Sequence, residues 1–185
     1  MKTFFVIFFW LWFLFSCTSQ TSTLENATGL TLFENTEFSM NIPSNWSILT
    51  NSWNVIPEPK YGKIAFAATS NELKYGFSNN LLILSQKLDK NINSLDFSIL
   101  NNVWSTKEYI EYTKLESKSF EFVDKEKSNL YIFEAKYNTT TPKLKFLQVG
   151  KVCSLSQAYL LTIALAIDIK DTSKYETILK TFTCK

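Results

Sequence analysis

The stretch Ala158-Tyr-Leu-Leu-Thr-Ile-Ala-Leu-Ala-Ile-Asp-Ile169 decides the fold, because a strand that is apolar on both faces belongs inside a sheet. A polar turn separates it from the strand predicted over Leu144 to Val152. A second turn, Asn138 to Pro142, leads back to the alternating segment Leu130 to Tyr137. Strands joined by short polar turns indicate an antiparallel meander. We therefore predict residues 158–169 as the central strand of an antiparallel sheet.

Two segments instead have the period of a helix. The first begins at Ser94, the predicted N-cap, and its apolar residues recur three and four apart. Its apolar side is predicted to consist of Leu95, Phe97, Ile99, Leu100, Val103 and Trp104. The second helix begins at Ser173, which forms a capping box with Glu176.

Shorter strands are predicted upstream, over 38–42, 46–48, 64–68 and 81–84. The order of strands, one helix, a meander and a terminal helix favours an α+β domain. The predicted fold class is thus a central antiparallel sheet flanked by helices.

The N-terminal end has the pattern of an export signal. Lys2 precedes the apolar run Phe4 to Phe15, and the small residue Ser16 stands at the expected cut. A membrane-spanning helix needs about 20 apolar residues, so this run is too short for one. We predict a signal peptide over residues 1–16.

A cysteine stands directly after this signal. The stretch Leu14-Phe15-Ser16-Cys17 resembles the bacterial lipobox, from which it departs at the bulky Phe15. We predict lipid attachment at Cys17, a lipidated N-terminus and flexible tether over 17–32, and one domain over 33–185. The alternatives are an ordinary secreted protein without lipid and an uncleaved short anchor.

Composition excludes several kinds of site. All 19 basic residues are lysine, and the chain has no histidine. Sites built on Ser-His-Asp, Cys-His or zinc-binding Cys₂His₂ sets are therefore impossible. The net charge of +2 gives no sign of a nucleic-acid partner. We predict no catalytic residue, metal or cofactor and no enzymatic activity; the alternative is an envelope hydrolase that uses carboxylates or a Ser/Lys pair.

Two further features concern the domain itself. Cys153 and Cys184 form an even pair in an exported chain, which predicts a disulfide, with two free thiols as the alternative. The segment 52–62 is rich in proline and carries Trp53 and Tyr61, which makes it a candidate partner-binding loop. The alternative is a loop folded over the sheet edge.

Several motifs resemble PsbP-like and DcrB-like domains. They are Phe38-Ser-Met-Asn-Ile-Pro-Ser-Asn-Trp46, Phe77-Ser-Asn-Asn-Leu81, the helix at Ser94, Ala158-Tyr-Leu-Leu-Thr162 and the helix over Asp171 to Phe182. The resemblance covers about Phe33 to Phe182. It implies a central antiparallel sheet flanked by helices, as an α/β/α sandwich. It also implies a non-enzymatic accessory or binding protein, often an exported lipoprotein, without catalytic residues to carry over.

These observations together predict a function by location. We expect a lipid-anchored protein of the bacterial cell envelope, facing the periplasm or exterior. Its partners would be the membrane, through the lipid, and an envelope protein or ligand that the sequence does not identify.

Overall fold

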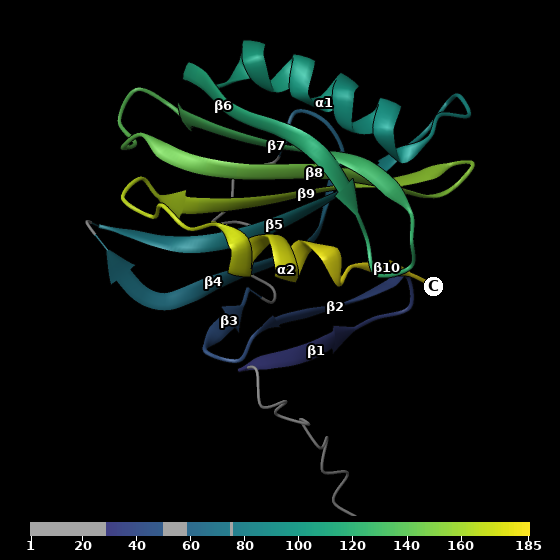
Figure 1. Cartoon of the computed structure of the whole chain (residues 1–185), viewed down its shortest axis with the longest axis horizontal. Helices are drawn as coiled ribbons and strands as arrows, with labels where there is room; N and C mark the ends of the chain where they lie inside the picture. The colour runs from purple at the N-terminus through teal and green to yellow at the C-terminus, as the bar shows by residue number, and fades with distance from the viewer. Residues whose placement is uncertain (1–28, 50–58, 75) are drawn as a thin grey trace, which may run out of the picture.

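The computed structural model describes residues 29–49, 59–74 and 76–185. The predicted signal peptide, Cys17 and Trp53 lie outside the described residues. The elements are β1 (Leu30–Glu34), β2 (Phe38–Pro43), β3 (Trp46–Ile48), β4 (Lys63–Lys74), β5 (Phe77–Lys87), α1 (Ser94–Glu108), β6 (Ile110–Glu121), β7 (Lys127–Lys136), β8 (Leu144–Ser154), β9 (Gln157–Ala166), α2 (Ser173–Lys180) and β10 (Thr183–Cys184) (Figure 1).

The larger sheet has seven strands in the order β3-β4-β5-β9-β8-β7-β6, and every pair in it is antiparallel. The predicted central strand is confirmed, because β9 stands in the middle between β5 and β8. The predicted meander is β7-β8-β9. All of β9 except its first residue is buried, as its largely apolar sequence requires.

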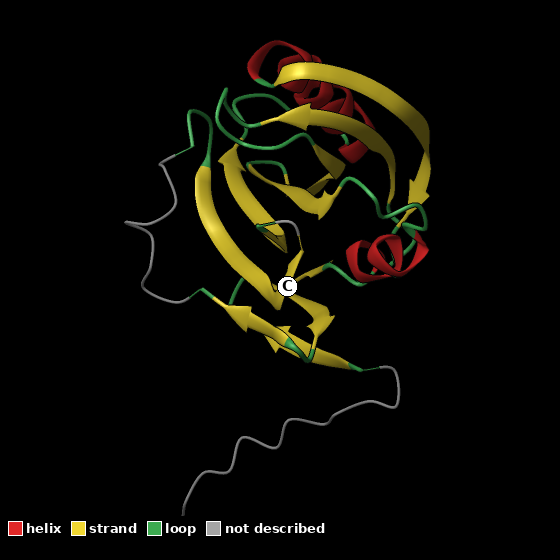
Figure 2. Ribbon diagram, turned by 90° about the vertical axis from the view of Figure 1, so that its left-hand side faces the viewer, coloured by secondary structure: helices red, strands yellow, loops and turns green. Residues whose placement is uncertain are grey.

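The predicted fold class is wrong. The described residues form two sheets and only two helices, so the fold is rich in strands and is not a helix-flanked sandwich. Strands β1, β2 and β10 make a separate three-stranded sheet (Figure 2). The alternating residues Phe38, Met40 and Ile42 of β2 bury their side chains in the main core. This small sheet therefore covers part of the main core beside α2, where a helix-flanked sandwich would have helices alone.

The two helices lie on opposite faces of β9. Tyr159 and Leu161 share the main hydrophobic core with Tyr175 and Leu179 of α2. Leu160 points the other way, because side chains alternate along a strand, and it clusters with Phe97 of α1. In the described part of the chain, neither helix is long and apolar enough to cross a membrane.

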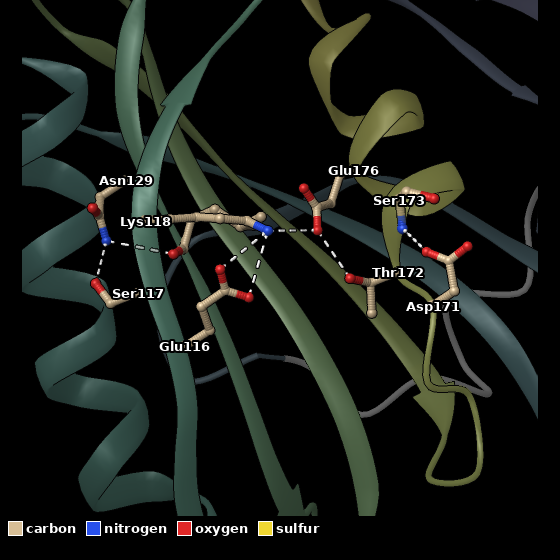
Figure 3. Close-up of polar contacts among 9 residues, drawn as sticks. Glu116, Ser117, Lys118, Asn129, Asp171, Thr172, Ser173 and Glu176 are labelled. Carbon is tan, nitrogen blue, oxygen red and sulfur yellow. Dashed lines mark hydrogen bonds and ion pairs between the residues drawn. The ribbon is translucent and has the colours of Figure 1, made fainter.

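Helix α2 is fixed at its first turn by polar contacts to β6. Glu176 accepts a hydrogen bond from the Thr172 hydroxyl at 2.9 Å and pairs with Lys118 of β6, also at 2.9 Å (Figure 3). The predicted capping box is wrong, because these two groups engage the Glu176 carboxylate and the N-cap is Thr172. Asp171 accepts the backbone N–H of Ser173 at 2.9 Å.

The C-terminal end is tied to the larger sheet by covalent and ionic contacts. A disulfide joins Cys153 of β8 to Cys184 of β10, with a Cα–Cα distance of 5.6 Å. Nearby, the Lys151 side chain is 2% exposed and pairs with Asp124. Its ammonium group also donates to the Phe182 carbonyl at 3.1 Å. These contacts hold the last residues against the end of β8.

Candidate binding groove

Helix α1 packs on the sheet with a polar face, which is the reverse of the prediction. Of the predicted apolar side only Phe97 is buried, whereas Leu95, Ile99, Leu100, Val103 and Trp104 are 40–47% exposed. The buried face otherwise consists of Ser94, Ser98, Asn101 and Ser105. The predicted N-cap at Ser94 is also wrong: Asn93 caps the helix by accepting the Asp96 N–H at 2.8 Å.

The serines replace strand pairing that β8 lacks. The register between β7 and β8 extends only to Val149, so the next backbone groups of β8 need other partners. Ser98 Oγ accepts the Gly150 N–H at 2.6 Å, and Ser94 Oγ accepts the Val152 N–H at 2.9 Å. Ser128 Oγ donates to the Gly150 carbonyl at 2.7 Å. We call these contacts between α1 and β8 the polar seam. They explain why the face of α1 that packs on the sheet is rich in serine.

Gly150 also allows the helix to approach closely. A Cβ on this residue would lie 2.4 Å from Cδ1 of Phe97, which is far inside contact distance. Further along, the Ser105 hydroxyl donates to Gln148 Oε1 at 2.8 Å, and Gln148 Nε2 donates to Thr162 at 3.2 Å. The seam therefore fixes both the height and the rotation of α1.

The last residues of the predicted partner loop, 59–62, cross over the C-terminal half of α1. Tyr61, at the end of that loop, stacks on Trp104 with ring centroids 4.9 Å apart, and Lys60 pairs with Glu108 at 2.6 Å. Gly62 has φ +80°, and a Cβ there would lie 2.7 Å from the Ser85 carbonyl oxygen. Residues 59–62, which we call the strap, are thus fixed to both α1 and β5.

Next to α1, the same side of the sheet carries an open cavity of about 650 Å³, which we call the groove. Its floor includes Ala67 of β4 and Leu82 and Leu84 of β5, and Tyr109 and Tyr137 stand along it. A smaller cavity of about 240 Å³ continues under the strap and shares Leu84 and both tyrosines. Asn80, Asn138 and Thr141 supply polar groups to the groove.

The groove is uncharged. No Asp, Glu or Lys is among its lining residues in the described part of the chain. The rings of Tyr109 and Tyr137 lie 5.6 Å apart. Burial raises the pKa of Tyr109 above its usual value, and burial together with the neighbouring Tyr109 raises that of Tyr137. Tyr137 keeps an exposed edge, so Tyr109 is the more deeply placed of the two. Both phenols are neutral at physiological pH and can donate hydrogen bonds.

The charged groups that a hydrolase would use are placed elsewhere. The buried Lys151 is paired with Asp124 on the other side of the sheet, against the ring of Phe122 at 4.4 Å. Glu108 lines the smaller cavity, and its partner is Lys60. Among the described residues, no three His, Cys, Asp or Glu side chains come together as a metal site would require. Among the described residues, the groove itself is therefore lined by apolar and uncharged polar side chains, and the paired Lys60 and Glu108 line only the smaller cavity.

Sequence reasoning missed the groove because its walls come from distant segments. Tyr109 directly follows α1 and Tyr137 directly follows β7, and neither position carries a local motif. The polar seam did leave a signal: Ser94, Ser98, Asn101 and Ser105 are spaced four, three and four apart, which places them on one helix face. The polar face was not predicted to pack on the sheet, because the opposite face is apolar and has the pattern of a buried side.

Comparison with known proteins identifies the fold alone. No family model and no curated protein matches the chain. Its structure is similar to the solution structure of cyanobacterial PsbP (CyanoP) from Synechocystis sp. PCC 6803, with a TM-score of 0.59 and 11% identity over 93% of this chain and 99% of that one. A Bacteroides thetaiotaomicron VPI-5482 protein matches at a TM-score of 0.42 and 11% identity, over 80% of this chain and 45% of that one. The fold is PsbP-like.

Proposed function

We propose that this chain is a lipid-anchored binding module of the bacterial cell envelope, and that its groove takes an uncharged, largely apolar ligand. The groove is the observation that carries the proposal. Its volume of about 650 Å³ lies within the range of roughly 300–1,000 Å³ that small-molecule sites occupy. Apolar walls with a few polar groups are the usual composition of such sites.

The electrostatics of the groove favour a neutral ligand. A charged group placed among Leu82, Leu84 and the tyrosines would lose its hydration without gaining an opposite charge. The Tyr109 and Tyr137 hydroxyls and the Asn80 and Asn138 amides offer hydrogen bonds to a ligand carbonyl or hydroxyl. An apolar molecule with one or two such groups is the ligand class that fits best.

A non-enzymatic role is part of the same proposal. The PsbP-like fold supports it, as does the sequence resemblance to PsbP-like and DcrB-like domains, whose members are mostly accessory or binding proteins. Lys151 pairs with Asp124, and Glu108 pairs with Lys60. Each is therefore held by an opposite charge rather than placed to take a proton from a substrate as a catalytic base would be.

The lipid anchor rests on the sequence around Cys17, and the disulfide supports the compartment. Structural disulfides persist in oxidising surroundings outside the cytoplasm, and Cys153–Cys184 is such a bond. A Cys17→Ser variant produced in bacteria should no longer incorporate a palmitate analogue, whereas the unmodified chain should be labelled. Label that persists in the variant would show that the anchor is elsewhere.

The groove can be tested with N-phenyl-1-naphthylamine, an uncharged apolar dye whose fluorescence rises in apolar sites. Leu82→Lys places a charge in the groove and should weaken dye binding at least tenfold. Leu73→Lys is the matched control, because Leu73 is 71% exposed at the end of β4 and does not line the groove. Circular dichroism checks that both variants fold. An unmodified protein that leaves the dye unbound, or equal affinities in all three proteins, would refute the site.

A further inference from the structure

The outward face of α1 is an apolar surface on a helix whose orientation is fixed. We call it the outer stripe, and it consists of Leu95, Ile99, Leu100, Val103 and Trp104. These side chains are 40–47% exposed; Ile99, Leu100 and Val103 project away from the polar seam, and Leu95 and Trp104 lie at the two edges of the stripe, with Tyr61 of the strap stacked on Trp104. Contiguous apolar patches that stay exposed on a folded domain commonly mark interaction sites.

The helix cannot turn this face inward. Rotation would break the hydrogen bonds that the Gly150 and Val152 N–H groups donate to Ser98 and Ser94, and it would leave these backbone groups unpaired. The Phe97 ring, seated against Gly150, opposes the same motion. Among residues 29–49, 59–74 and 76–185, nothing further covers the outer stripe, which stays exposed in a single copy of this part of the chain.

Charges stand at the two ends of this stripe. Asp96 lies in the first turn and Lys107 in the last turn, and both are exposed. They are eleven residues apart, which is about three turns of helix, so both fall on the centre line of the outer stripe. Glu108 is paired with Lys60 of the strap and so does not offset Lys107. One end of the stripe is thus negative and the other positive.

We propose that the outer stripe is an interface between two copies of this chain, packed antiparallel about a two-fold axis. This arrangement places Asp96 of one copy beside Lys107 of the other at both ends of the contact. A parallel arrangement would bring Asp96 against Asp96 and Lys107 against Lys107. Antiparallel packing also sets the two helix dipoles in opposition, which is favourable. A two-fold contact of this kind is the commonest form of homodimer.

The axis then falls between Leu100 and Val103, because these residues lie symmetrically about the midpoint of Asp96 and Lys107. Leu100 of one copy faces Val103 of the other, and Leu95 of the two copies lie at opposite ends. The i, i+4 rows of apolar residues supply the ridges that such helix pairs interlock.

The contact is small, below the roughly 800 Å² per partner of a standard interface, so association in dilute solution is weak. Under the proposed anchoring, both copies share one membrane plane, which raises their effective concentration. The two-fold contact itself does not depend on the anchor.

The test is disulfide capture in bacteria that express two differently tagged copies of the full chain. Leu100→Cys in one copy and Val103→Cys in the other should give a mixed disulfide dimer that carries both tags. Leu95→Cys in both copies is the matched control and should stay monomeric, since antiparallel packing separates these positions by about 20 Å along the helix.

A charge exchange tests the direction of packing. Asp96→Lys in both copies should reduce the Leu100–Val103 capture at least fivefold, and adding Lys107→Asp should restore it. Monomers only, capture of other proteins only, or a Leu95 homodimer would each overturn the proposal.

Discussion

The polar seam under α1 predicts an unusual order of mutational effects, with Ser98→Ala more damaging than the loss of an apolar residue on the same helix. Ser98 Oγ accepts the Gly150 N–H at 2.6 Å and donates to the Asn129 carbonyl at 2.9 Å. Alanine leaves both groups without this partner, at a cost of about 1–3 kcal/mol for each buried group. Alanine has a higher helix propensity than serine, which offsets this cost by about 0.5 kcal/mol. We expect a net loss of about 1.5–5.5 kcal/mol in the free energy of unfolding.

Val103→Ala is the comparison. Val103 is 45% exposed, so the two lost methyl groups cost only about 0.8 kcal/mol at roughly 0.8 kcal/mol per fully buried group. The gain in helix propensity is about 0.5 kcal/mol, which leaves a net change under about 0.5 kcal/mol. An ordinary amphipathic helix would show the opposite order, because its valines face the core and its serines face water.

Urea unfolding followed by circular dichroism measures both variants, with the midpoint compared at constant slope. Hydrogen exchange at Gly150 supplies a second reading, because this amide should lose its protection in Ser98→Ala alone. If Val103→Ala lowers the free energy of unfolding more than Ser98→Ala does, α1 packs on the sheet by its apolar face. The described packing of α1 through its serines would then be refuted.

Three further changes have defined outcomes. Reducing the disulfide, or Cys184→Ser, should lower the free energy of unfolding by about 3–4 kcal/mol for a closed loop of this length, seen as a lower urea midpoint; the variant should then be insensitive to reductant. Gly62→Ala should loosen the strap, because φ there is +80° and β5 leaves no room for a Cβ, so Tyr61 should become more accessible to nitration. The hydrogen bond that the Ser173 backbone N–H donates lowers the pKa of Asp171, so its contribution to stability is present above the ordinary pKa of 3.8 and is lost as pH falls through the lower folded value. The difference in melting temperature between Asp171→Ala and the unmodified protein should therefore be larger at pH 6 than at pH 2.

The parts of the fold that the sequence predicts are those set by local pattern. The largely apolar run of β9 and the polar turns on either side of β8 were sufficient to predict the meander. Helix α1 was found by its period, and its beginning was placed within one residue. Each of these features depends on residues that lie close together in the chain.

The parts that could not be predicted depend on pairing between distant residues. Alternation in β2 shows that it is a strand, but its partner β10 lies about 140 residues later and is only two residues long. The predicted orientation of α1 was wrong because its buried serines accept hydrogen bonds from unpaired backbone N–H groups of β8, which is distant in the sequence. The helix sequence alone does not show that β8 has unpaired N–H groups. The groove was not predicted either, because its walls also come from segments that are distant in the sequence.

Strand β1 gives the domain a particular response to mechanical load. It is the edge strand of the small sheet, and its first pair, Leu30 with Pro43, lies at the end where the chain enters. A pull on the chain ahead of Gly29 therefore acts first on the bond that the Ser44 N–H donates to Gly29 at 2.9 Å and on Leu30, which packs against the main core. Each residue that peels away adds about 3.4 Å of length. Phe33, whose ring centroid lies 4.3 Å from that of Phe66 in the core, resists further opening, so only the first residues of β1 lengthen under tension before the core carries the load.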